Sequence, residues 1–249
     1  MKTNSVKPQI VFIIPARKGS KRLKNKNSLT LAGRPLIWYT VEAAMAFKDN
    51  NPEYESRAVI STDIPDIIKY LYGIGRPAIE KRPERLATDT ASTYDVVRDL
   101  VPKIEIRDGV VFDVIVILQP TSPLRDALDI RGAIKCFFRK KANAVISMCR
   151  AEVPVQWLFS IDGKGGMNPF MRMKSKRFST PKQSLPELYR LNGAIYVFKR
   201  DFVMDAMRKN KNNVLSAKTY AYVMPENHSV DIDDKYDMLY ASALLNQRS

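Results

Sequence analysis

The sequence predicts an α/β protein with a Rossmann-like, mostly parallel or mixed sheet and helices on both faces. Two observations carry this prediction. Continuous apolar runs rich in β-branched residues recur along the chain, and segments with apolar residues at helical spacing separate several of them. Unbroken apolar runs are typical of strands buried on both faces of a sheet, and their alternation with amphipathic helices is typical of repeated β-α-β units.

The elements follow in a regular order. The first helix is expected over GRPLIWYTVEAAMAF, where Pro35 suits a first helical turn and Ile37, Val41 and Ala44 recur at helix spacing. By the same criterion, further helices are predicted over residues 64–71, 94–101, 130–138 and 235–245. The predicted strands are residues 10–14, 58–61, 111–118, 144–148, 194–198 and 220–224.

Residues 151–190 interrupt this rhythm. The segment mixes aromatic and basic residues, prolines and the sequence DGKGG, and it has no clear helical period. We therefore predict that residues 1–150 and 191–249 form one α/β domain. Residues 151–190 are expected to form an inserted subdomain, and added surface of that kind suits assembly and dimerisation.

Composition limits the class of protein. The chain is 45% hydrophobic and 27% charged, which is neither a disordered nor a membrane composition. No apolar run approaches the ~20 residues of a membrane span, and the apolar stretch near the start is too short for a signal-peptide core. We expect a cytoplasmic protein without a membrane partner. Cys136 and Cys149 show no metal or redox spacing and are predicted to be buried thiols.

Polar clusters follow the predicted strands at their carboxyl ends. ARKGSKR follows the first strand, STD (61–63) the second, QPTSPLR (119–125) the third, and VDIDD (230–234) comes shortly after the last. Ligands of open parallel sheets bind beyond the carboxyl ends of the strands. The four clusters are therefore expected to meet in one crevice.

The first cluster belongs to an unusually basic loop, IPARKGSKRLKNKN (14–27), with six lysines and arginines. Their mutual repulsion is unfavourable unless an anion offsets it, and the net charge of +15 attracts anions in general. Gly19 and Ser20 would let the backbone approach a phosphate. The loop matches neither a Walker A motif nor a dinucleotide turn. From the residues alone it is either a phosphate site or a solvated charge run or nucleic-acid patch.

The last cluster holds two acids, Asp231 and Asp233, whose side chains face the same way if the chain is extended. Carboxylates in that arrangement suit Mg²⁺ beside phosphates. The alternative is that Asp233 or Asp234 only caps the helix over residues 235–245. His228, the one histidine, cannot make a zinc site alone and is read as a surface or packing residue.

These motifs together resemble the CMP-sugar synthetases, specifically the N-acylneuraminate (sialic acid) cytidylyltransferases. IPARKGSKRLKNKN is similar to the family loop I-P-A-R-x-G-S-K-x-x-x-x-K-N. RPERLATDTAST (82–93) resembles R-P-x-x-L-A-x-D-x-A-S-S, and LQPTSPLR (118–125) matches its family counterpart. LNGAIYVF (191–198) and VDIDD fit N-G-A-I-Y and I-D-I-D in the right order. The resemblance implies a nucleotide-diphospho-sugar transferase-like fold.

The resemblance also implies a reaction, in which CTP and a nonulosonic acid give a CMP-sugar and pyrophosphate, and it implies a homodimer and Mg²⁺ as cofactor. It assigns catalytic roles to Arg17, Lys26 and Asp233, and metal binding to Asp231 and Asp233. It assigns nucleotide binding to Arg17, Ser20, Lys21, Lys26, Asn27, Arg82, Ala87 and Ser92. It assigns sugar-acid binding to Gln119, Thr121, Ser122, Lys182 and Tyr196.

Two departures from the family pattern leave alternatives open. Lys18 stands where the family often has Gly, and Lys182 stands where an arginine is expected to contact the sugar carboxylate. Lysine cannot make the bidentate contact of arginine, so N-acetylneuraminate is the first candidate but legionaminic, pseudaminic or another 2-keto sugar acid is an alternative. The stretch LP…NGAIY favours neuraminate or legionaminate over pseudaminate as the substrate.

A remote alternative of another class is a non-catalytic nucleic-acid-binding protein, suggested by the net charge. It predicts basic residues spread along one face with stacking aromatics. Here the basic residues concentrate at one turn, and two acids would repel a phosphate backbone. We therefore expect no nucleic-acid partner. DNA binding with a steep salt dependence, without turnover of CTP, would favour this alternative.

Overall fold

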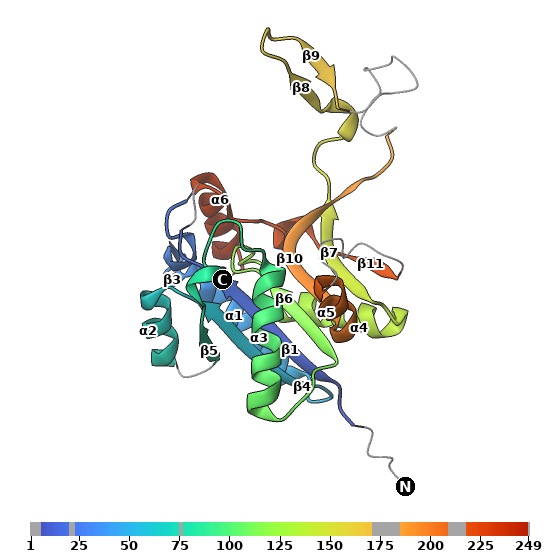
Figure 1. Cartoon of the computed structure of the whole chain (residues 1–249). Coiled ribbons are helices and arrows are strands. Elements are labelled where there is room, and N and C mark those ends of the chain that lie inside the picture. Colours follow the sequence, from blue (N-terminus) through green and yellow to red (C-terminus); the bar gives the residue numbers. More distant parts are fainter. Residues whose placement is uncertain (1–5, 20–22, 75–76, 171–184, 209–217, 249) are drawn as a thin grey trace.

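The computed structural model describes residues 6–19, 23–74, 77–170, 185–208 and 218–248. A seven-stranded sheet in the order β11-β7-β10-β6-β1-β4-β5 runs through the molecule (Figure 1). All its neighbouring strands pair in parallel except β10, which is antiparallel to both β6 and β7. The strands are β1 (Gln9–Ala16), β4 (Glu55–Thr62), β5 (Ala78–Lys81), β6 (Val114–Leu118), β7 (Ala144–Arg150), β10 (Tyr189–Lys199) and β11 (Thr219–Val223).

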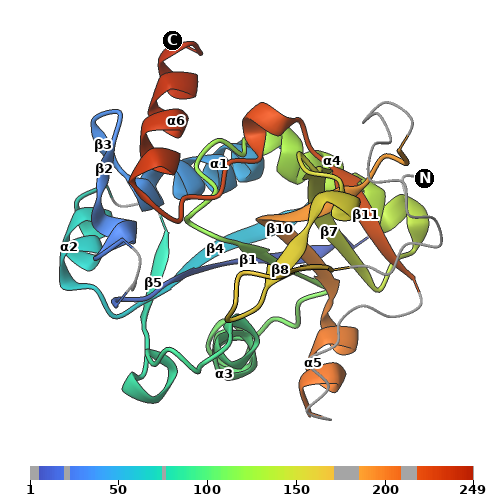
Figure 2. The same cartoon turned by 90° about the horizontal axis from the view of Figure 1, so that it is seen from above.

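The prediction of a mixed, mostly parallel sheet with helices is therefore confirmed. The helices are α1 (Leu36–Asn50), α2 (Pro65–Ile74), α3 (Thr93–Asp108), α4 (Ala127–Lys140), α5 (Arg200–Arg208) and α6 (Lys235–Asn246). Figure 2 shows α1 and α4 on one face of the sheet and α3 and α5 on the other. The short edge strand β5 was not predicted, because AIEK is partly charged and none of its four residues is buried.

Alternation along β1 divides the apolar core between the two faces. Ile10, Phe12 and Ile14 belong to the cluster beneath α1, α2 and α4, whereas Val11 and Ile13 belong to the cluster against α3. This follows from the two-residue period of a strand, which sends successive side chains to opposite faces.

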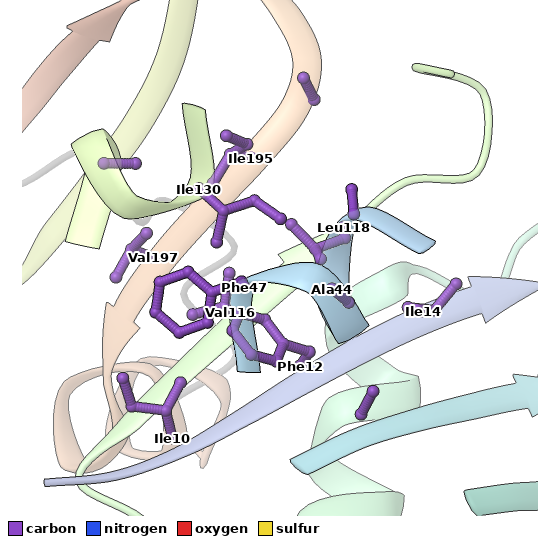
Figure 3. Close-up of a cluster of buried hydrophobic side chains, with 14 of the residues drawn as sticks. Ile10, Phe12, Ile14, Ala44, Phe47, Val116, Leu118, Ile130, Ile195 and Val197 are labelled. Carbon is purple, nitrogen blue, oxygen red and sulfur yellow. The ribbon is translucent and has the colours of Figure 1, made fainter. Parts of the chain in front are cut away.

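Aromatic packing fixes α1 on its face of the sheet. The rings of Phe12 and Phe47 meet edge to face, with centroids 5.2 Å apart (Figure 3). Both side chains are fully buried. An edge-to-face aromatic pair of this kind adds to the gain from burial alone.

The described residues include no helix long and apolar enough to cross a bilayer.

The predicted insertion contains a two-stranded sheet of its own. β8 (Phe159–Ile161) pairs with β9 (Met167–Pro169), and this hairpin projects from the body of the molecule (Figure 1). Its apolar side chains are largely in water, with Ile161 73% and Phe170 72% exposed. β10 begins at Tyr189, so this strand of the main sheet starts inside the predicted insertion.

Candidate active site

A cleft of about 340 Å³ lies where the loops after β1, β5 and β6 meet. These loops follow the carboxyl ends of parallel strands. Of the four polar clusters expected to meet there, three supply lining residues, whereas none of the STD cluster (61–63) lines the cleft. The residues that line the cleft are Pro15, Arg17, Lys26, Asn27, Arg82, Ala91, Ser92, Thr93, Val96, Gln119, Pro120, Thr121 and Asp233.

The basic loop is held near both ends of its described part. The Arg17 guanidinium lies 2.8 Å from Oδ1 of Asp89, and Nδ2 of Asn27 donates to the Arg17 carbonyl at 3.1 Å. Gly19 has a φ of +84°, a backbone conformation that glycine adopts without strain. The turn therefore presents Arg17 to the cleft, while Ser20 and Lys21 lie outside the described residues.

Lys26 joins the basic loop to the acidic segment. Its Nζ donates to the carbonyl of Ile232 at 2.6 Å and lies 3.1 Å from Oδ1 of Asp233. The Lys26 side chain is only 14% exposed, whereas the Asp233 side chain is 48% exposed, so the ammonium group is shielded from solvent more than its partner. Residues separated by about two hundred positions thus meet in one site.

The N-terminus of α6 shows which acid of VDIDD caps that helix. Asp234 is the N-cap, where its side chain accepts from the backbone N–H groups of Tyr236 and Asp237, and Asp237 completes a capping box. Asp233 is not the N-cap and lines the cleft. The segment VDIDD therefore contains one capping acid and two acids outside that role.

Asp231 is suited to a cation. Burial and the negative charge of Asp233 raise the pKa of its carboxyl group, although hydrogen bonding with Thr121 and the charge of Lys26 oppose the shift. Its Oδ1 is buried and has no hydrogen-bond partner among the described residues. Two neighbouring carboxylates with a buried free oxygen fit a hard divalent ion such as Mg²⁺.

Arg82 forms another cationic wall of the cleft. Its side chain is buried, with Nη2 donating to the Ser61 carbonyl at 3.0 Å and Nε to the Ser61 hydroxyl at 3.3 Å. Burial lowers the pKa of Arg82 to about 10, against the favourable charge of Asp63. The group therefore stays charged at neutral pH and is fixed by the end of β4.

The N-terminus of α3 supplies a side of the cleft that was only partly predicted. Ser92 is the N-cap, and its hydroxyl accepts from the Asp95 N–H and donates to the Asp95 carboxylate at 2.8 Å. Thr93 and Val96 in the first turn were not predicted to line the site. The S-x-x-D pattern of residues 92–95 is the available signal, because it marks a helix start at this point. Ala87 is not among the lining residues.

Only some of the residues predicted to bind the sugar acid line the cleft. Gln119 and Thr121 line the cleft. Ser122 is fully buried beneath it, and its hydroxyl has no partner among the described residues. Tyr196 does not line the cleft, but it lies near enough to Asp231 for that charge to add to burial in raising the pKa of Tyr196. Lys182 lies outside the described residues.

Gly193 brings β10 against the acids. It has a φ of +74°, and a Cβ added there would lie 3.3 Å from Oδ2 of Asp231 and 3.6 Å from Oε1 of Gln119. Both the backbone conformation and the close approach favour glycine at this position. The motif NGAIY thus contributes its backbone to the site.

Arg125 lies under the site and was not predicted as a functional residue. It is 2% exposed, and its Nη1 donates to the carbonyls of Gln119 at 3.3 Å and Ala194 at 3.0 Å. The loop after β6 is thereby tied to β10. Burial lowers the pKa of Arg125 to about 10, opposed by the charges of Asp129 and Asp126.

The fold and the cleft define a nucleotidyltransferase-like α/β protein with a cationic site at the carboxyl ends of its strands. The same fold occurs in the solved structure of a CMP:2-keto-3-deoxy-manno-octonic acid synthetase complexed with CTP. The two share a TM-score of 0.66 and 17% identity over 97% of this chain and 100% of that one.

Sequence comparisons then give the family. The family model for cytidylyltransferases matches residues 11–212. A CMP-N,N'-diacetyllegionaminic acid synthase of Legionella pneumophila is 33% identical over 97% of this chain and 99% of its own length. An N-acylneuraminate cytidylyltransferase of Escherichia coli is 30% identical over 98% of this chain but only 54% of its own length. The chain belongs to the cytidylyltransferase family and, within it, groups with the CMP-sugar synthetases, as its motifs predicted.

Proposed function

We propose that this protein transfers the cytidylyl group of CTP to the anomeric hydroxyl of a nonulosonic acid, with N-acetylneuraminate as the first candidate. A bond forms between the sugar oxygen and the α-phosphorus, the bond to the β-phosphate breaks, and pyrophosphate leaves. The observation that carries this proposal is the meeting of Lys26 with Asp233 in a cleft that also holds Arg17 and Arg82.

The basic residues of the loop repel one another, and a bound nucleotide would offset this repulsion. CTP brings about four negative charges and the sugar acid one more. Arg17 and Lys26 are assigned to the triphosphate, where they offset the charge that accumulates on departing pyrophosphate. Arg82 and the backbone near Ser92 are assigned to the cytosine. Gln119 and Thr121 are assigned to the sugar acid, which fixes its hydroxyl for in-line attack.

Mg²⁺ is the proposed cofactor, and Asp231 and Asp233 are the residues that would hold it. The support is the buried, unpartnered Oδ1 of Asp231 beside a second carboxylate. When bound, the ion would neutralise phosphate oxygens of the nucleotide. The chain's own part is to hold the two carboxylates opposite the basic loop.

The identity of the sugar is the open choice within this proposal. A legionaminate enzyme and a neuraminate enzyme resemble the chain to a similar degree. Lys182, in place of the expected arginine, also fits a sugar acid other than N-acetylneuraminate. The second candidate is therefore the same reaction on legionaminic acid, with pseudaminic or another 2-keto sugar acid behind it.

We further propose a homodimer in the cytoplasm. The exposed apolar residues of the β8–β9 hairpin support the dimer, because a monomer would leave them in water. Cys136 and Cys149 are both free and buried, as predicted, and free thiols are typical of a reducing compartment.

A pyrophosphate-release assay tests the proposal. The purified protein is incubated with each of four nucleoside triphosphates against a panel of N-acetylneuraminic, legionaminic, pseudaminic and deaminated nonulosonic acids, with and without Mg²⁺. We expect release with CTP and one or two of the sugar acids only when Mg²⁺ is present. No release with any sugar acid, or equal release with all four nucleotides, would contradict the proposal.

A further inference from the structure

The segment that carries the two aspartates has little secondary structure of its own. Between β11 and α6 it contains one 3₁₀ turn, Glu226–His228, and otherwise irregular chain. Such a segment must be positioned by contacts with its neighbours, because it has no ladder of backbone hydrogen bonds. Downstream it is held by the N-cap at Asp234 and by the Ile232 N–H, which donates to the Thr121 carbonyl at 2.7 Å.

Upstream, His228 attaches the segment to α4. Its Nδ1 lies 2.7 Å from Oδ2 of Asp129, in the first turn of that helix. Asp129 is 5% exposed, and the same carboxylate accepts from the N–H of Asp126 in the α4 capping box. The acceptor is therefore a rigid one, so the contact fixes where the turn stands relative to the sheet.

Ser229 adds a second attachment at the next residue. Its hydroxyl accepts from Nδ2 of Asn192 at 2.9 Å and donates to the Pro225 carbonyl at 2.7 Å. Asn192 lies in β10 and is itself held by the Ser147 hydroxyl, which donates to its Oδ1 at 2.6 Å. Consecutive residues of the segment are thus tied to α4 and to β10, two positions before Asp231.

A metal site at the His228 contact is the competing interpretation. Ligand atoms of Asp126, Asp129 and His228 all lie within 4.8 Å of one another. However, Asp126 accepts two backbone N–H groups of α4, and Asp129 accepts the Asp126 N–H together with His228. The buried Arg125 guanidinium also provides positive charge for both acids. Helix capping and His228 already provide hydrogen bonds for these acids, so the cluster suits positioning rather than cation binding.

We propose that Asp129 and His228 are positioning residues that hold Asp231 and Asp233 where the two carboxylates can bind a divalent cation. The inference rests on the proposed function, since it takes these aspartates as the metal ligands. Neither Asp129 nor His228 lines the cleft, so both act through the segment 229–233. Residues that orient metal ligands commonly change metal affinity about 10- to 100-fold when they are replaced.

The test compares three variants of the full chain. His228→Ala removes the contact with Asp129, His228→Asn keeps a side-chain N–H near the position of Nδ1, and Glu226→Ala is the matched control in the same turn. Mn²⁺ binding is measured by electron paramagnetic resonance of the free ion, without substrates. The half-saturating Mg²⁺ concentration for turnover, kcat at saturating Mg²⁺, and Tm are measured alongside.

We expect His228→Ala to weaken Mn²⁺ binding about tenfold and to raise the Mg²⁺ requirement by a similar factor. kcat at saturating Mg²⁺ should stay within about twofold, His228→Asn should recover most of the affinity, and Glu226→Ala should equal the wild type. A lower Tm with wild-type Mn²⁺ affinity would reject the proposal and leave His228 a packing residue. A wild-type protein that binds no Mn²⁺ and turns over without metal would instead reject the metal assignment itself.

Discussion

At the scale of single residues, Asp233 and Asp234 are neighbours in sequence with different surroundings. Asp234 caps α6, whereas Asp233 lies beside Lys26 and lines the cleft. Asp233→Asn should therefore lower turnover by about 10²- to 10³-fold, because a carboxylate that offsets and orders cations in the site is lost. Asp234→Asn should stay within a few-fold of the wild type, since asparagine is also a good N-cap.

Steady-state kinetics with CTP and circular dichroism of both variants check this prediction. An Asp233→Asn protein that is folded and fully active at wild-type Mg²⁺ concentrations would remove Asp233 from the metal site. Loss of activity in both variants, with loss of helical signal, would indicate a fold defect instead.

The basic loop offers a second comparison between near neighbours. Lys26 is largely buried against Ile232 and Asp233, whereas Lys24 is exposed. Lys26→Ala should raise KM for CTP or lower kcat by about tenfold or more, because a shielded charge–phosphate contact is lost. Lys24→Ala should change either constant by less than about threefold. Wild-type constants for Lys26→Ala would place the triphosphate elsewhere.

At the scale of elements, the capping box of α3 gives a dependence of stability on pH. Hydrogen bonds from Ser92 to its carboxylate hold the pKa of Asp95 below its usual value. A depressed acid pKa contributes stability above the unfolded-state pKa of about 4, and that stability is lost as the pH falls through the folded-state pKa. Because the Asp95 side chain is 38% exposed and screened by solvent, Asp95→Asn should lower the free energy of unfolding by only about 0.3–0.5 kcal/mol at pH 7.

Urea denaturation of the wild type and Asp95→Asn at several pH values measures the difference. The difference in free energy of unfolding between the two proteins should have its full value at pH 6–7. It should shrink below about pH 4, where the wild-type carboxylate becomes protonated. A difference that does not change between pH 7 and pH 3 would contradict the charged form as the source of the stabilisation.

The contact between α4 and β11 can be tested through Gly132. A Cβ added there would lie 2.7 Å from Cε2 of Tyr222 and closer still to the hydroxyl end of that side chain. Overpacking costs about 1–3 kcal/mol, but the tyrosine ring can shift and alanine favours the helix by up to ~1 kcal/mol over glycine, so Gly132→Ala should lower the free energy of unfolding by up to about 2 kcal/mol. At Gly73 in α2, no atom of the described residues lies within 4 Å of an added Cβ, so Gly73→Ala should instead be neutral or stabilising by up to ~1 kcal/mol.

Thermal unfolding of Gly132→Ala in the wild-type and Tyr222→Ala backgrounds completes the comparison. Removing the tyrosine ring should abolish most of the cost, because the clash is specific to it. A cost that persists without Tyr222 would mean that the backbone of α4, rather than the tyrosine, requires glycine.

At the scale of the whole molecule, elements with a long periodic pattern could be predicted from the sequence. Contacts between residues that are far apart in the sequence could not. The buried strands and most of the helices show local periods of two and 3.6 residues, so the mixed sheet could be predicted. The nine-residue helix α5 was not predicted. β5 is short and partly charged, which leaves no such period. The hairpin of β8 and β9 is likewise short, and its three-residue strands expose most of their side chains.

The candidate site likewise combines residues that local sequence could place with contacts between distant residues that it could not. Asp233 and the basic loop follow predicted strands, so the rule for carboxyl ends places them in one crevice, and Asp231 lies beside it without lining it. The link from Asp129 to His228 joins residues 99 positions apart through one histidine, and no local pattern marks it. Arg125 reads in sequence as part of a polar loop, although its side chain is buried. Burial of a charged side chain depends on tertiary contacts that a short motif does not encode.

Assembly also belongs to this scale and is the last prediction. The hairpin exposes Ile161 and Met167, at 73% and 65%, and charges there would oppose burial of the hairpin in an interface. We expect the wild type to be a dimer and Ile161→Asp/Met167→Asp to be a folded monomer in light scattering coupled to gel filtration. Leu239→Asp on α6, an equally exposed apolar site away from the hairpin, is the matched control and should remain a dimer. A dimeric hairpin variant together with a monomeric Leu239→Asp protein would move the interface to α6.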